Sequence, residues 1–294
     1  MSRSHLKRSA RRLTLAGIAM ATTMVLAACG SSSTDSGGSG GSGGATAGND
    51  AAASGLNQAG TLTVGMNLQF KPEMYLDAAG KPAGYDVELL NKLAAELGVK
   101  LDIQNLDFNG LIPGLQSKKF DMVSVGLTAT DARKQVIDFS REYVPYTSVL
   151  AVKEGDTSPA TIDTYNTPST IITALQGSTG EQLAKKTFPQ AQVKSFADQN
   201  AALLEVSTGR ATGSVLEDYI LAQYQKANPG QVKKSPQPKP LDLSYGSWAV
   251  QKGNSALTGK LNAFLCKAQN DGTLKQVYNQ TFEVADFPAM PGGC

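Results

Sequence analysis

From Thr61 onward, short apolar runs alternate with segments whose apolar residues recur at helical spacing. We predict strands at 61–65, 99–103 and 120–125, with helices at 87–97 and 111–115 between them. Strands separated by helices in this way form βαβ units with a largely parallel sheet. The sequence therefore predicts an α/β fold of about 240 residues, which suffices for one large domain or two lobes.

A second α/β region begins near Val149. Its predicted strands are 169–174, 212–216 and 243–250, and its predicted helices start at 181, 200 and 218. The segment 228–240, rich in Pro and Lys, is predicted as an exposed loop, and 257–264 and 274–278 as closing helices. Local signals mark helix ends: Asp86 as an N-cap, Gly98 at a C′ position, and Ser178 with Glu181 at capping-box spacing.

The run GLTATDAR, residues 126–133, follows a predicted strand and enters a helix at Thr130 or Asp131. Such a turn gathers glycine backbone, hydroxyls and unpaired helix N–H groups, which together favour a small anion. Arg133 adds a planar guanidinium that matches two carboxylate oxygens, a contact of about 1.5–3 kcal/mol. These residues alone fit equally well a capped helix with a surface arginine.

The first 28 residues are predicted to be a lipoprotein signal peptide. Five basic residues precede an apolar run, 13–28, that is too short for a usual membrane span. The run ends in LAAC, which resembles a bacterial lipobox and implies cleavage before Cys29 and lipidation of its thiol. Residues 29–55 are then the lipidated Cys and a flexible Gly/Ser-rich linker. We expect an extracytoplasmic protein anchored to the bacterial cell membrane; the alternative is an ordinary signal peptide with a chance cysteine.

Charge and residue usage exclude several function classes. The chain has 27 basic and 25 acidic residues, and loss of the signal peptide removes five basic ones, so no basic stripe suggests nucleic acid. The only histidine, His5, lies in that segment, which excludes histidine-based triads and most zinc sites. We expect no cofactor or metal. Cys266 and Cys294 are an even pair that predicts a disulfide, with two free thiols as the alternative.

Three blocks resemble the polar amino-acid-binding proteins of ABC importers: DFNGLIPGLQSKKFDMVSVGLTATDARKQVIDFS, GYDVELLNKLAAELG and YGSWAVQKGN. The resemblance runs from about Thr61 to Phe282. It implies a type II periplasmic-binding-protein-like fold, in which two lobes with mostly parallel sheets close over a ligand. Two crossover strands, near 148–152 and 245–250, would join lobe 1 (56–148 and 246–294) to lobe 2 (149–245).

The resemblance also implies roles for individual residues. Gly126, Thr128 and Arg133 match the positions that meet the ligand carboxylate, and Ser178 and Thr179 match its contact in the second lobe. Phe70 matches an aromatic ring over the ligand, and Asn67 a contact to the ligand side chain. Glu217 matches the acid that pairs with the α-ammonium.

Some of these positions have other interpretations. Glu217 stands where Asp is usual and is followed by Asp218, which leaves two candidate partners for the ammonium. The irregular stretch FKPEMY after Asn67 leaves Glu73, Met74 or Tyr75 as further candidates for the pocket. Phe70 alone fits a core residue, Ser178 a simple cap, and Glu217 a solvated charge.

The resemblance implies a monomeric binding protein, not an enzyme, that captures a polar L-amino acid and delivers it to an ABC permease. An amino-acid-related dehydratase on the same fold, with Glu217 as acid or base, is the alternative from another class. A ligand-sensing surface lipoprotein is the third. The sequence does not identify the amino acid or the permease.

Overall fold

The computed structural model describes residues 55–283, 287 and 290–294. The predicted signal peptide, Cys29 and nearly all of the predicted linker lie outside the described residues. No described helix has both the length and the apolar character needed to cross a membrane.

Two groups of parallel strands form the two halves of the folded part. In the first half, β1 (Thr61–Met66) pairs in parallel with both β5 (Lys100–Asn105) and β6 (Met122–Thr128). In the second half, β8 (Ile171–Leu175) pairs in parallel with both β9 (Gln192–Phe196) and β10 (Gly213–Glu217). The predicted α/β class with parallel strands is confirmed.

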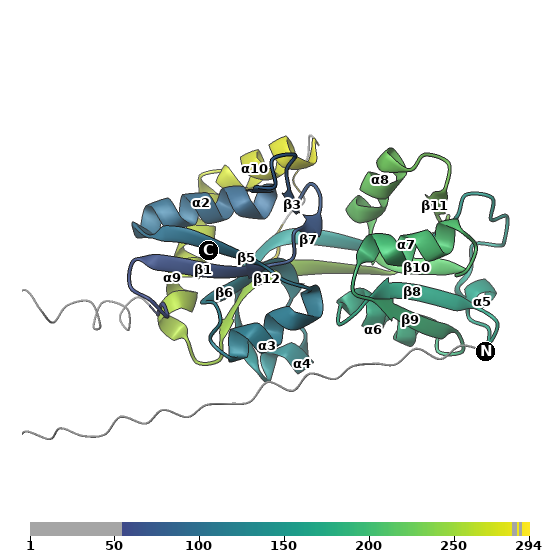
Figure 1. The fold of residues 1–294 in the computed structure, drawn as a ribbon, viewed down its shortest axis with the longest axis horizontal. Helices are drawn as coiled ribbons and strands as arrows, with labels where there is room; N and C mark the ends of the chain where they lie inside the picture. The colour runs from purple at the N-terminus through teal and green to yellow at the C-terminus, as the bar shows by residue number, and fades with distance from the viewer. Residues whose placement is uncertain (1–54, 284–286, 288–289) are drawn as a thin grey trace, which may run out of the picture. The chain divides into compact units, whose positions relative to one another are not determined.

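Two long strands run through both halves. β7 (Ile137–Lys153) and β12 (Asp242–Gln251) pair antiparallel, and the sheet order is β5-β1-β6-β12-β7-β10-β8-β9. The parallel groups are thus the two ends of one continuous sheet, with β7 and β12 between them (Figure 1). The predicted lobe boundaries, 148/149 and 245/246, fall inside these two strands.

Helices cover both faces of each half. Figure 1 shows α2 (Tyr85–Leu97) and α10 (Thr273–Phe282) on one side of the first-half strands, and α3 (Leu111–Gln116) and α9 (Ser255–Asn270) on the other. In the second half, α6 (Thr179–Thr187) and α7 (Gln199–Ser207) flank β8. The remaining helical segments are η1 (Phe108–Gly110), α4 (Asp131–Lys134), α5 (Ile162–Tyr165) and α8 (Asp218–Ala227).

Four short strands complete the fold. A hairpin sheet is built from β2 (Gln69–Phe70), β3 (Met74–Leu76) and β4 (Pro82–Ala83). β11 (Val232–Lys234) pairs with β7, so the predicted loop 228–240 contains a short strand.

The two ends of α2 test the predicted capping residues, of which Gly98 is confirmed and Asp86 is not. Gly98 ends α2 in the left-handed conformation at φ 66°, as predicted. The N-cap of α2 is Gly84, so the prediction of Asp86 as N-cap is wrong. Asp86 lies inside the first turn and is fully buried, where it accepts hydrogen bonds from Ser124 Oγ at 2.7 Å and Tyr143 Oη at 2.8 Å.

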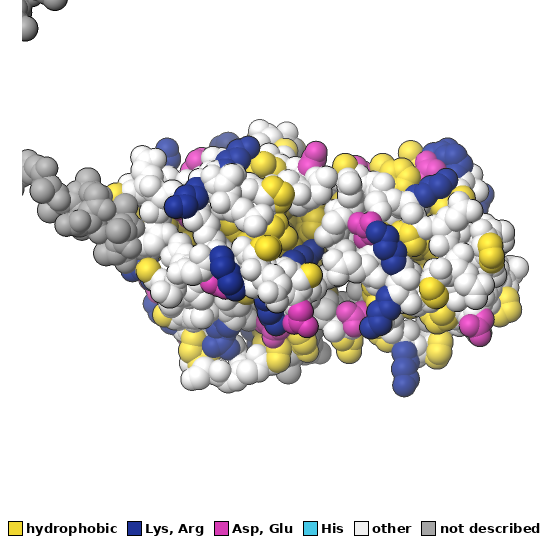
Figure 2. Space-filling model, turned by 90° about the horizontal axis from the view of Figure 1, so that it is seen from below, with side chains coloured by type: hydrophobic (Ala, Val, Ile, Leu, Met, Phe, Trp, Pro, Cys, Tyr) yellow, Lys and Arg dark blue, Asp and Glu magenta, His cyan; other side chains and the backbone are white. Residues whose placement is uncertain are grey.

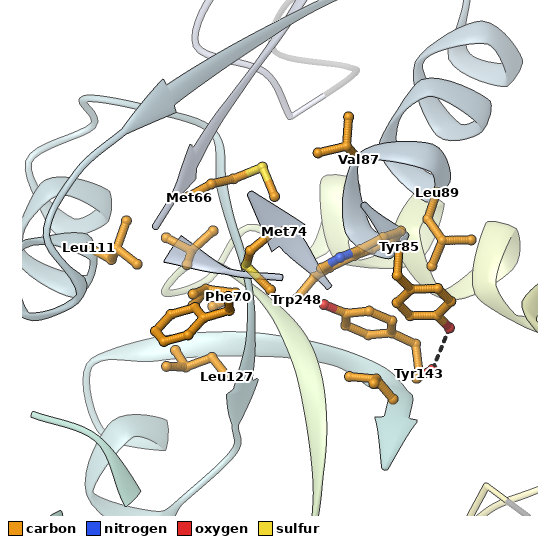
Figure 3. Close-up of a cluster of buried hydrophobic side chains, with 14 of the residues drawn as sticks. Met66, Phe70, Met74, Tyr85, Val87, Leu89, Leu111, Leu127, Tyr143 and Trp248 are labelled. Carbon is orange, nitrogen blue, oxygen red and sulfur yellow. Dashed lines mark hydrogen bonds between the residues drawn. The ribbon is translucent and has the colours of Figure 1, made fainter. Parts of the chain in front are cut away.

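Aromatic side chains fill the core of the first half. Trp248, Tyr85 and Tyr143 are among the largest fully buried side chains. The Tyr85 hydroxyl donates to the Tyr143 carbonyl oxygen at 2.9 Å (Figure 3). The end of the chain is tied to this half, because Cys266 of α9 and Cys294 form a disulfide with a Cα–Cα distance of 5.5 Å.

Candidate functional site

A cavity of about 40 Å³ is lined by residues of both halves. Seven of the eight predicted ligand-binding residues line it: Phe70, Gly126, Thr128, Arg133, Ser178, Thr179 and Glu217. Phe70 is buried in the same cluster as Met66, Leu111 and Leu127 (Figure 3), so it is both a core residue and part of the cavity wall.

The first wall is the turn between β6 and α4. Gly126 has φ 55°, in the left-handed region that glycine tolerates best. Thr130 caps α4 by accepting a hydrogen bond from the Arg133 N–H. The helix therefore begins where the sequence predicted, at Thr130 or Asp131. The Arg133 side chain then folds back, and its Nη1 donates to the Thr128 carbonyl oxygen at 2.9 Å.

Arg133 also reaches across to the second half. Its Nη2 donates to the Gly177 carbonyl oxygen at 3.0 Å, and its guanidinium carbon lies 5.9 Å from the centre of the Phe108 ring. The side chain is only 6% exposed, and burial lowers the pKa of Arg133 to about 10. It therefore remains a cation at neutral pH and faces inward rather than bulk solvent.

The second wall is the turn between β8 and α6. Gly177 has φ 76°, and Ser178 Oγ caps α6 by accepting from the Glu181 N–H at 3.1 Å. The Glu181 carboxylate accepts from the Gly177 N–H at 2.7 Å, which completes a reciprocal cap. Thr179 and Gly180 follow in the first turn, where backbone N–H groups lack intrahelical partners, and both line the cavity.

Glu217 is the acid that opens onto the cavity. It stands at the end of β10 and is half-buried. Burial raises the pKa of Glu217, while the positive charge of Arg133 lowers it. Asp218 is instead paired with Lys234 at 2.9 Å between Nζ and Oδ2. Of the two candidate partners for an ammonium group, Glu217 is therefore the one placed in the cavity wall.

Asn67 is the predicted site residue that does not line the cavity. Its amide donates to the Leu106 carbonyl oxygen at 2.6 Å and accepts from Gln69 Nε2 at 2.5 Å. Gln69 in turn accepts from the Gln199 backbone N–H at 2.9 Å across the two halves. These bonds orient Gln69, and the contact of Asn67 with a ligand side chain stays a prediction.

Sequence reasoning missed several cavity residues. Phe108, Tyr146 and Tyr219 add aromatic rings, and Gln199 adds an amide. The Gln199 side chain is 3% exposed, and its Nε2 is buried without a hydrogen-bond partner. The only sequence signal for these cavity residues was the aromatic content of their segments, because the residues that they contact are distant in the sequence.

Charged side chains of both signs are mixed on the surface (Figure 2). On the face drawn in Figure 2, Lys and Arg side chains are spread over both halves with acidic side chains between them. Among the described residues, no group of His, Cys, Asp and Glu is arranged to hold a metal ion.

Comparison with known proteins adds a consistent result. The model of the bacterial extracellular solute-binding proteins, family 3, matches residues 62–284. The arginine-binding extracellular protein ArtP of Bacillus subtilis is 29% identical over 268 residues, covering 90% of this chain and 95% of the relative. A probable histidine-binding protein of Neisseria gonorrhoeae is 29% identical over 237 residues, covering 80% and 88%.

Solved structures agree with these sequence relatives. An ancestral arginine-binding protein bound to glutamine superposes with a TM-score of 0.71 at 34% identity, covering 78% of this chain and 100% of that one. The ancestral amino acid-binding protein AncCDT-1, a precursor of cyclohexadienyl dehydratase, has a TM-score of 0.69 at 32% identity, with 76% and 95% covered.

Proposed function

This chain belongs to the bacterial extracellular solute-binding proteins of family 3, and we propose that it captures a polar L-amino acid outside the cytoplasm and delivers it to an ABC importer. One observation carries the proposal. A buried base, Arg133, and an acid, Glu217, open onto the same cavity from opposite halves. A free amino acid carries the two complementary charges.

The proposed carboxylate site is the first wall. The Gly126 N–H, the Thr128 hydroxyl and the Arg133 guanidinium would meet the ligand carboxylate, and the first turn of α6 would meet it from the other side. A buried carboxylate needs such partners, because unmet desolvation costs several kcal/mol.

The proposed ammonium site is Glu217. Burial raises the pKa of Glu217. A bound ammonium would supply the opposite charge and favour the ionised form. Glu217 would therefore lose a proton on binding in the pH range where it is partly protonated in the free protein.

The ligand side chain would lie among Phe70, Phe108 and Leu175, with the Gln199 amide at the wall. The unpaired Gln199 Nε2 favours a side chain that offers a hydrogen-bond acceptor. Relatives named for binding arginine and histidine support a polar side chain on the ligand.

Delivery and anchoring are proposed from the sequence. The LAAC motif ending at Cys29 supports lipidation, and residues 29–55 support a tether that lets the folded part meet a membrane permease. A clamp that closes on its ligand presents a different surface when loaded, which a permease can read.

Binding is favoured over catalysis. The compared relatives are named as binding proteins, and the solved neighbour related to a dehydratase is itself named an amino acid-binding protein. Recovery of the amino acid unchanged after long incubation with the protein would support binding, and a converted product would contradict it.

The direct test is a thermal-shift screen against the common L-amino acids, followed by titration calorimetry. A molecule that binds only the folded state stabilises it by about 2.7 kcal/mol at a hundred times its Kd. We expect at least one polar L-amino acid to raise the melting temperature, and its D-enantiomer to raise it less. A screen in which no amino acid shifts the melting temperature would contradict the proposal.

A further inference from the structure

Glu73 is a buried carboxyl group beside the cavity that the proposed binding contacts do not use. It lies between β2 and β3 and is 1% exposed. Its Oε1 accepts a short hydrogen bond from the Tyr146 hydroxyl, and its Oε2 accepts from the Tyr219 hydroxyl at 2.5 Å. Both tyrosines line the cavity, whereas Glu73 lies behind them.

The three residues come from different parts of the fold. Glu73 belongs to the first half, Tyr146 to the crossing strand β7, and Tyr219 to α8 of the second half. The two tyrosine rings stack with centres 6.0 Å apart, and the Tyr219 ring meets the Phe282 ring of α10 edge-on at 5.5 Å. Tyr219 is therefore a second-half side chain that the first half and β7 surround.

We propose that Glu73 is a positioning residue: it fixes the two tyrosine hydroxyls at the cavity wall and, through Tyr219, holds the second half closed on the first. The inference rests on the proposed function only in taking the closed cavity as the binding state. Other contacts also join the halves, among them Arg133 to Gly177 and Gln199 to Gln69. Glu73 differs from these because its carboxyl does not itself line the cavity.

Charge around Glu73 explains how it stays buried. No ion pair between described residues involves it. Burial and the nearby Asp86 carboxyl raise its pKa well above the usual value, while the two tyrosine hydrogen bonds lower it. Protonation would remove the large cost of a buried unpaired charge, and the protonated oxygen would then donate to its tyrosine hydroxyl instead of accepting from it.

The cluster also abuts the proposed carboxylate site. A Cβ atom added at Gly126 would overlap the Tyr146 hydroxyl and lie 2.8 Å from Glu73 Oε1. The Glu73 cluster thus packs directly against the Gly126 backbone. A shift of Glu73 would therefore also move the Gly126 N–H, which we assign to the ligand carboxylate.

Two single-atom deletions test the proposal in the full chain without any amino acid. Tyr219→Phe removes the hydroxyl that crosses between the halves. Tyr146→Phe is the control, because it removes the other tyrosine hydroxyl that bonds to Glu73. We expect Tyr146 and Glu73 to stay together when the two halves open. Dyes placed through unnatural amino acids at the exposed positions Lys92 and Lys186 would report closure by single-molecule energy transfer.

We expect Tyr219→Phe to raise the ratio of open to closed molecules about tenfold, the effect of losing one strong hydrogen bond. Tyr146→Phe should change that ratio less than threefold. An unchanged ratio in Tyr219→Phe, equal effects of both variants, or a native protein with no closed fraction would overturn the proposal. Because no amino acid is present, these results are independent of whether the proposed ligand binds.

Glu73 itself is tested by two substitutions. Glu73→Gln keeps an acceptor for Tyr219 and a donor for Tyr146, so it should stay within threefold of the native ratio. Glu73→Leu should open the protein about tenfold, and adding Tyr219→Phe should add little, because both remove the same bond. Independent, additive effects would overturn the proposal. If Glu73→Leu does not fold by circular dichroism, Glu73→Gln and Tyr219→Phe are compared as single variants, and a Glu73→Gln ratio raised as much as that of Tyr219→Phe would overturn the proposal.

Discussion

The two strand-to-helix turns that face each other across the cavity share one local design. Each has a glycine with positive φ near the end of a parallel strand, Gly126 at 55° and Gly177 at 76°. Each then has a hydroxyl residue, Thr130 or Ser178, that caps the following helix. Similar local chemistry therefore builds both walls.

The two turns differ in the direction in which their charged side chains point. In the second turn, Glu181 turns back to its own backbone at Gly177. In the first, Arg133 points into the cavity and donates to carbonyl oxygens of both turns. The first turn thus supplies most of the electrostatic attraction for an anion, and the second supplies shape and backbone donors. Substitutions in the two turns should have unequal effects.

Exchanging each glycine for alanine should show the largest difference. At Gly126 the new Cβ would overlap the Tyr146 hydroxyl, and the left-handed backbone adds strain. We expect Gly126→Ala to lower the free energy of unfolding by about 4 kcal/mol. At Gly177 the nearest atom is 3.7 Å away, so Gly177→Ala should cost only the backbone strain of about 1–2 kcal/mol. Equal losses in denaturant unfolding would remove the distinction.

The strands beneath the two turns should differ in their response to pH. Ser124 of β6 donates to the buried acid Asp86, whereas Thr173 of β8 donates to the Ala202 carbonyl oxygen at 2.9 Å. Burial raises the pKa of Asp86 to about 7. The folded protein then keeps a proton that the unfolded chain releases near pH 4, so stability is lost as pH rises toward 7.

Between pH 5 and 8 this loss should be about 3 kcal/mol, since one pKa unit corresponds to about 1.4 kcal/mol. Glu73, whose pKa is also raised, acts in the same direction. Asp86→Asn should flatten the pH profile of the unfolding free energy, while Thr173→Val should leave its slope unchanged. A protein that becomes more stable over this range would contradict the assignment.

Removing the charge of the first turn should weaken binding without unfolding the protein. Arg133→Ala should reduce affinity for the amino acid found in the screen by at least tenfold, about 1.4 kcal/mol. Arg133→Lys should recover part of the loss, because it restores the charge without the planar fork. If calorimetry gives Arg133→Ala the same affinity as the native protein, the proposed role of the first turn in ligand binding is wrong.

Removing the cap of the second turn should have the smallest effect. Ser178→Ala deletes the acceptor for the Glu181 N–H and should cost about 1 kcal/mol of stability. Affinity should fall only a few-fold, since the backbone N–H groups of α6 remain. A loss as large as that of Arg133→Ala would show that the Ser178 hydroxyl itself binds the ligand.

Features set by local chemistry could be predicted from the sequence. The caps at Thr130 and Ser178 and the left-handed Gly98 depend on neighbouring residues. The resemblance to a known family supplied the residues of both walls. Asp86 was misplaced because its spacing fits a cap, yet the chain turns at Gly84 and buries the acid under β6.

Features set by long-range packing could not be predicted. Glu73 contacts Tyr219, which is 146 positions away in the sequence. The hydrogen bonds of Asn67 to Leu106 and Gln69 become apparent only in the folded chain. Residues of this kind depend on which strands become neighbours, and no local pattern encodes that.

The most direct test of the account is calorimetry with the best amino acid from the screen and its α-carboxamide, measured on the native chain and on Arg133→Ala. The account predicts that the native chain binds the carboxylate form at least tenfold more tightly than the amide. It also predicts that Arg133→Ala loses most of this preference. Equal affinity of the native chain for both compounds, or an undiminished preference in Arg133→Ala, would contradict it.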